Sequence, residues 1–200
     1  DAGYTHYEGM NYPYGEHVLF TDNQPVFSAA LQWWSRHISD ISADTVGLMN
    51  WFQVISMLIG AGAIFLLLRK LHIPVWYAGI ASLGILFLSP QNNRFDTHFG
   101  LSHTWILPML LLLLCRYEER FSRRYQSLLI GILLFFAAQL HFYNFGVSAI
   151  FLGLYTAYQI LTDFRWKNIA KRSYHLIVMV VLPFTLLNLW IHWSDYCPDR

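Results

Sequence analysis

The feature that most constrains this chain is a run of thirty-seven residues, 126–162, that contains no Asp, Glu, Lys or Arg. As one helix this run would be about 55 Å long, far more than the roughly 30 Å of a bilayer's hydrocarbon layer. Two spans joined by a tight turn at residues 141–146 fit better. With 56% hydrophobic and 12% charged residues, the whole chain is typical of membrane proteins rather than soluble ones.

The other apolar runs extend this interpretation to the rest of the chain. They predict an all-α fold, a polytopic membrane helix bundle of about six transmembrane helices. The predicted spans are residues 46–68, 73–88, 101–115, 126–141, 145–162 and 175–192, with a basic loop at 163–172. Residues 193–200 would begin a further segment outside the membrane. The chain begins at Asp1 and ends just after an apolar run, so we expect a fragment of a larger protein with at least one more membrane helix upstream.

Residues 1–45 form a separate, polar and aromatic region before the first span. Within it, apolar residues recur at helical spacing over 25–38, which predicts a short amphipathic helix lying in the membrane interface. Asp22 comes just before this helix, next to other capping residues and ahead of Pro25. The sequence therefore predicts that Asp22 sits at a loop-to-helix junction, where it can cap the helix.

The distribution of charge predicts which side of the membrane each loop occupies. With residues 1–45 outside, ten of the thirteen basic residues fall in the three inner loops, 69–70, 116–124 and 163–172. Only Arg36, Arg94 and Arg200 then lie outside, together with nine of the twelve acids. This arrangement obeys the positive-inside rule, so we expect an extracytoplasmic N-terminal loop. The basic residues follow no stripe or groove, which argues against nucleic acid as a partner.

Three residues of the outer loop 90–103 are candidate phosphate-binding groups. Arg94 is a basic residue in an outer loop and so is an exception to the positive-inside rule. Its guanidinium group can bind two oxygens of a phosphate at once. His98 and His103 flank a glycine near a predicted helix start, where free N–H groups favour an anion. The alternatives are that Arg94 pairs with Asp96 or a lipid phosphate, and that both histidines are ordinary interfacial residues.

The N-terminal loop supplies the candidate catalytic residues. Asp22, Glu16 and His17 could exchange protons with a substrate, and Tyr12 and Tyr14 could stack on a sugar. Asp22 could equally be a helix cap only. Glu16 and His17 are adjacent in a loop, and this spacing does not define how their side chains are arranged. No zinc-ligand spacing is present, so the metal and the cofactor stay open, with a divalent cation such as Mg²⁺ or Mn²⁺ as one alternative.

Two motifs resemble a known class of enzymes. The run from Asn11 through Phe20-Thr21-Asp22 to Pro25, and the run from Arg94 to His103 before an apolar span, are similar to motifs of uncharacterised bacterial membrane proteins in the GT-C class of polytopic glycosyltransferases. The resemblance covers residues 1–115. It implies a multi-pass protein of the bacterial inner membrane that moves a sugar from a polyprenyl-phosphate donor to an acceptor at the outer face. Membrane lipids and the lipid-linked donor are the implied partners.

The resemblance also implies roles for individual residues. Arg94, helped by His98 or His103, would stabilise the phosphate leaving group, and Asp22 would act as general base or hold a divalent ion. Two other classes remain open. A transporter or flippase segment would use polar residues within the spans, with Gln139 and His141 as the best candidates. A non-catalytic membrane subunit is the third.

Overall fold

The computed structural model describes residues 6–7, 16–22, 24–94, 98–118 and 123–194. A two-residue antiparallel pair, β1 (His6–Tyr7) with β2 (Glu16–His17), precedes the amphipathic helix α1 (Pro25–His37). The helices that follow are α2 (Thr45–Lys70), α3 (Val75–Phe87), α4 (Ile106–Glu118), α5 (Arg123–Leu140) and α6 (Phe142–Thr162). The helix α7 (Trp166–Leu176), a π-helical turn (Ile177–Val181) and α8 (Leu182–Ser194) complete the fold.

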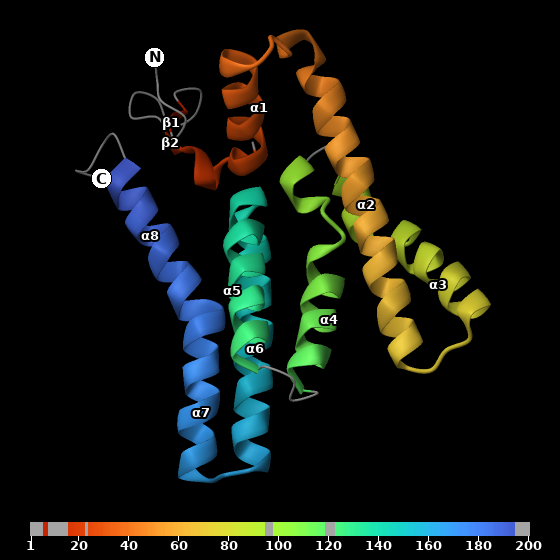
Figure 1. Ribbon diagram of the computed structural model, residues 1–200, viewed down its shortest axis with the longest axis vertical. Coiled ribbons are helices and arrows are strands. Elements are labelled where there is room, and N and C mark those ends of the chain that lie inside the picture. The colour runs from red at the N-terminus through yellow and green to blue at the C-terminus, as the bar shows by residue number, and fades with distance from the viewer. Residues whose placement is uncertain (1–5, 8–15, 23, 95–97, 119–122, 195–200) are drawn as a thin grey trace.

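The helices run back and forth between two ends of the molecule (Figure 1). One end, which we call the hairpin end, carries β1, β2, α1, the junction of α5 with α6 and the end of α8. The other, which we call the basic end, carries the α2–α3 and α6–α7 connections, the end of α4 and the start of α5. The loops predicted to share one side of the membrane thus gather at one end of the bundle.

Four of the described helical segments are long and apolar enough to cross a membrane: Ser42–Lys70, Phe99–Glu118, Phe142–Thr162 and Trp166–Ser194. The predicted fold class is therefore confirmed at the level of a helical protein with helices long and apolar enough to span a membrane. The two other predicted spans are also helical. However, α3 has 13 residues and would be about 20 Å long. Helix α5 begins with two arginines and lies largely buried among its neighbours.

The outward surface of the bundle is apolar. On α3, Trp76 is 84% exposed, and Tyr77, Ile80 and Phe87 are exposed with it. Soluble proteins rarely expose a continuous patch of large apolar side chains. This surface is suited to contact with lipid tails, which agrees with the membrane class predicted from composition.

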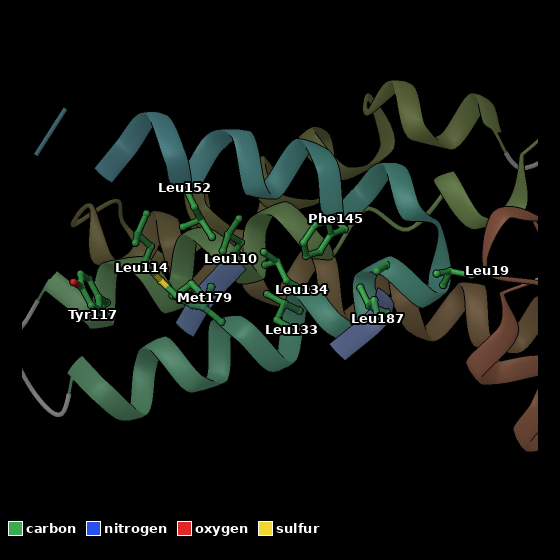
Figure 2. Close-up of a cluster of buried hydrophobic side chains, with 12 residues drawn as sticks. Leu19, Leu110, Leu114, Tyr117, Leu133, Leu134, Phe145, Leu152, Met179 and Leu187 are labelled. Carbon is green, nitrogen blue, oxygen red and sulfur yellow. The ribbon is translucent and has the colours of Figure 1, made fainter. Parts of the chain in front are cut away.

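The core is a cluster of buried side chains around α5. Its members come from α4, α5, α6, the π-helical turn and α8, and Leu19 joins it from the N-terminal loop. Figure 2 shows the cluster extending along the bundle from Tyr117 near the basic end to Leu19 at the hairpin end. Leu19 is 1% exposed, so its burial holds the N-terminal loop against the helices.

Two predicted boundaries are wrong. The turn predicted at 141–146 is a single residue, because His141 is extended and its Nδ1 accepts the backbone N–H of Tyr143, which caps α6 at once. The basic loop predicted at 163–172 is helical from Trp166. There the charged residues extend the last helix beyond its apolar part, so one continuous helix runs from Trp166 to Ser194.

The π-helical turn has an identifiable cause in the sequence. It lies just before Pro183, which has no N–H to donate and whose ring crowds the preceding turn. The turn also packs closely on α5, because a Cβ at Gly131 would lie 2.7 Å from the carbonyl oxygen of Val178. A glycine is needed at that contact for α5 and the last helix to approach so closely.

Candidate functional site

The N-terminal loop is fixed to the end of α8 before it reaches Asp22. His17 is 3% exposed, its Nε2 lies 2.9 Å from Ser194 Oγ, and its Nδ1 accepts the Leu19 N–H at 3.2 Å. The ring also meets the edge of Trp190, with 4.9 Å between ring centroids. After this anchor, Thr21 donates from both its hydroxyl and its N–H to the Val18 carbonyl, which turns the chain toward Asp22.

Asp22 reaches across to a segment 78 residues away. Its Oδ1 accepts the backbone N–H of Gly100 at 2.7 Å, and its Oδ2 lies 3.8 Å from Nδ1 of His98. The Asp22 side chain is 30% exposed, so the carboxylate is held but still open to solvent. The predicted helix cap is wrong, because the N-cap of α1 is Gln24, in a left-handed conformation with no side-chain cap bond.

Gly100 joins the two motifs to the α5–α6 junction. A Cβ at this position would lie 2.5 Å from the Leu140 carbonyl oxygen and 2.6 Å from Asp22 Oδ1. The Gly100 carbonyl accepts a hydrogen bond from Asn144 Nδ2 at 3.2 Å. Only a glycine allows the Asp22 carboxylate and the end of α5 to approach one backbone position so closely.

His141 stands at this junction, outside the helices, with Asp22 and His98 nearby. Burial lowers the pKa of the His141 imidazole below its usual 6.5, while the Asp22 carboxylate raises it and His98 lowers it further. Because Nδ1 accepts the Tyr143 N–H, the neutral ring carries its proton on Nε2. His141 is therefore a hydrogen-bond donor at neutral pH.

A cavity of about 400 Å³ lies at the same place. Its lining residues are Pro90, Gln91, Arg94, Leu101, His141, Tyr143 and Asn144. Arg94 is exposed, and none of the described carboxylates forms an ion pair with it. The predicted partner Asp96 lies outside the described residues. The cavity thus has a cation on its wall and amide and imidazole donors around it, which suits an anionic or hydroxyl-rich ligand.

Some of the predicted site residues lie apart from this cavity. His103 is 1% exposed and points toward α2, where its Nδ1 lies 2.9 Å from Ser56 Oγ and its ring meets Phe52. His17 faces α8 through its contacts with Trp190 and Ser194. Glu16 belongs to β2, pairing with Tyr7, and its side chain is outside the described residues, as are Tyr12 and Tyr14.

The structure therefore brings together two of the predicted residues, Asp22 and His98, and it places a third, Arg94, on the wall of the cavity that His141 also lines. His141, Asn144 and Gly100 also belong to this site, and they were not predicted to bind a phosphate or a sugar. The available signal was a histidine and an asparagine three residues apart inside an uncharged run, at the point where the chain must turn.

Among residues 16–22, 24–94, 98–118 and 123–194, no group of three or more His, Cys, Asp or Glu side chains is arranged to hold a metal ion. The distances around Asp22 fit this finding, because its nearest imidazole nitrogen, on His98, is 3.8 Å away. The described donors alone therefore do not build a divalent-cation site.

Comparisons with known proteins add one finding. A family model described as "Domain of unknown function (DUF6311)" matches residues 3–194, which is nearly the whole chain. No curated protein and no solved structure matches the chain.

Proposed function

We propose that this chain, which belongs to the DUF6311 family, is a membrane glycosyltransferase of the GT-C type. It would move a sugar from a polyprenyl-phosphate donor to an acceptor at the outer face of the bacterial inner membrane. One observation carries the proposal: Asp22, held by Gly100, lies close to His141, which lines the same cavity as Arg94. A carboxylate and a cation at the end of apolar helices are the groups that this transfer needs.

The proposal includes six spans, with the basic end in the cytoplasm. When α3 and α5 are counted as spans, successive spans cross the membrane in opposite directions. The loops at the basic end then carry most of the Lys and Arg residues. The hairpin end would then face outward. A lipid-linked donor could place its phosphate at this boundary while its chain lies along the apolar helices.

In the reaction, the acceptor hydroxyl loses its proton to Asp22 as its oxygen bonds to the anomeric carbon. The bond from that carbon to the phosphate oxygen breaks, and polyprenyl phosphate leaves as an anion. Asp22 Oδ1 is occupied by the Gly100 N–H, so Oδ2 is the oxygen that can take the proton. Arg94 stabilises the charge of the departing phosphate, and no general acid is needed there.

The neighbouring groups would orient the sugar. His141, with its proton on Nε2, and the amides of Gln91 and Asn144 line the cavity and can bond hydroxyl groups. His98 would be an electrostatic partner of Asp22 at 3.8 Å. His103 has no part in this mechanism, because it points toward α2.

The first test changes the two charged residues separately. Asp22→Asn keeps an oxygen that can accept the Gly100 N–H but removes the base, and Arg94→Ala removes the phosphate partner. Membranes with either variant should release polyprenyl phosphate from a panel of sugar donors at least about a hundredfold more slowly than the wild type.

Asp40→Asn and Arg36→Ala are matched controls, since both residues lie in or just after α1 and outside the cavity lining. Both should retain activity. Normal transfer by Asp22→Asn and Arg94→Ala, at equal membrane insertion, would overturn the assignment.

A transporter or flippase remains a second candidate, favoured by polar groups buried between α2 and the segment 102–104. Gln53 bonds Ser102 and Ser56 bonds His103, while Gln53 Oε1, His103 Nε2 and Thr104 Oγ1 are buried without partners among the described residues. Polar groups inside a bundle are typical of transport pathways. Gln53→Leu should abolish uptake into vesicles if this candidate is right, and leave sugar transfer intact if it is not.

A further inference from the structure

A second, larger cavity lies at the basic end, away from Asp22. It has a volume of about 640 Å³ and is lined by the end of α4, the start of α5, the α6–α7 connection and α7. Its lining residues are Tyr117, Arg123, Arg124, Asp163, Arg165, Asn168, Lys171, Arg172 and His175. Five basic side chains therefore face one carboxylate. The volume is within the roughly 300–1,000 Å³ typical of ligand pockets.

The carboxylates near this cavity are already engaged. Asp163 makes a two-pronged pair with Arg165 at 2.8 and 3.0 Å and accepts from Asn168 Nδ2 at 2.5 Å. Glu118 accepts hydrogen bonds from Tyr155 and Gln159, both at 2.6 Å, and lies 4.0 Å from Arg123. Within the described residues, no carboxylate remains for Arg124, Lys171 or Arg172.

The floor of the cavity is formed by buried side chains. Tyr117 and His175 are both 3% exposed, and Ser127 Oγ lies 2.8 Å from His175 Nδ1, which ties α5 to α7 there. The Arg123 guanidinium carbon is 5.4 Å from the centre of the Tyr117 ring, and Arg123 Nε is buried without a partner among the described residues. A buried, unpaired guanidinium N–H requires an acceptor.

We propose that this cavity binds a phosphate or pyrophosphate group, as a second anion site at the opposite end of the molecule from Asp22. The positive-inside rule accounts for basic residues in loops, but not for their convergence from α5, α7 and the α6–α7 connection on one hollow. Guanidinium forks with an ammonium group bind phosphate oxygens well. The phosphate could belong to an anionic lipid headgroup or to a soluble phosphate ester.

The test uses the purified full chain in neutral detergent. Lys171→Gln combined with Arg172→Gln removes two cations from the wall. Arg116→Gln combined with Lys167→Gln removes two exposed cations at the same end that do not line the cavity. Titration calorimetry with inorganic pyrophosphate measures the soluble ligand, and native mass spectrometry with phosphatidylglycerol or phosphatidylcholine measures the lipid.

Pyrophosphate or phosphatidylglycerol, but not phosphatidylcholine, should bind the wild type and the control variant, and bind Lys171→Gln/Arg172→Gln about tenfold or more weakly. Binding in either arm supports the site, and the arm identifies the source of the phosphate. The swap Lys171→Arg/Arg172→Lys keeps both charges and should restore binding. Equal affinity in all variants, or no binding in both arms, would overturn the proposal. Asp22→Asn should not change phosphate binding at the basic end, so the outcome of this test is independent of the glycosyltransferase proposal.

Discussion

At the scale of single residues, the candidate site depends on Gly100 more than on any charged group. This glycine receives the Asp22 carboxylate through its N–H and Asn144 through its carbonyl, with the end of α5 against its Cα. Three segments far apart in sequence therefore meet at one backbone position that has no side chain.

The substitution Gly100→Ala should consequently destabilise the protein and disturb Asp22. The added methyl would lie 2.5 Å from the Leu140 carbonyl oxygen, a backbone atom that cannot move alone. We expect a loss of about 1–3 kcal/mol in the free energy of unfolding, measured by thermal or SDS unfolding in detergent. Gly153→Ala is the control, because nothing lies within 4 Å of its added methyl. Equal stability of both variants would contradict this role of Gly100.

His141 gives the site a predicted sensitivity to acid. Burial lowers its pKa in the folded protein. The unfolded chain therefore binds a proton first as pH falls, so the native state loses stability below about pH 6.5, while stability is complete above it. His141→Asn keeps a residue able to cap α6 but removes the titration.

The fall in melting temperature between about pH 7.5 and pH 5.5 should be smaller in His141→Asn than in the wild type. His37→Asn serves as control, since His37 is exposed at the end of α1. An identical fall in His141→Asn and the wild type would show that His141 does not titrate in this range.

At the scale of elements, a buried hydrogen bond between Ser127 and His175 couples α5 to α7. Ser127→Ala leaves the His175 Nδ1 without its partner, because both residues are buried. We expect a loss of about 1–2 kcal/mol in the free energy of unfolding. Ser173→Ala is the control. Ser173 lies on α7, the helix of His175, and makes no side-chain hydrogen bond to other described residues, so this variant should be nearly neutral in the same unfolding measurement. A neutral Ser127→Ala would contradict the coupling.

The helices themselves could be predicted because apolar runs and charge breaks are local signals. Each of the six predicted spans overlaps a helix, although α4 begins at Ile106 rather than at residue 101, and α1 falls where the amphipathic spacing placed it. The boundaries at His141 and Trp166 could not be predicted, since a one-residue junction depends on a side-chain cap and α7 carries charges that resemble a loop.

The site could be predicted only in part for a similar reason. Asp22, Arg94 and His98 were recognisable as chemical groups in two motifs. Their meeting depends on a contact between residues 22 and 100, which no local pattern encodes. His98 and His103 are five residues apart, yet the 3₁₀ turn at Phe99–Leu101 sends one toward Asp22 and the other toward α2.

At the scale of the whole molecule, the proposed orientation predicts which surface a reagent can reach. Single cysteines at Ala30 and Asn93, both exposed at the hairpin end, should react with a membrane-impermeant maleimide on intact cells. A cysteine at the exposed Lys167 should react only after permeabilisation. The native Cys115 and Cys197 are first replaced by alanine. The reverse labelling pattern would invert the topology and remove the proposed outer-face chemistry.

The bond between His17 and Ser194 joins residues that lie 177 positions apart, so the loop bearing Asp22 rests on α8, the last helix that the structure describes. During synthesis, that loop is made long before its support exists. A ribosome that stalls ahead of residue 182 leaves a chain whose early helices can insert but whose Asp22 loop lacks this anchor. Assembly of the site therefore waits until α8 has been translated.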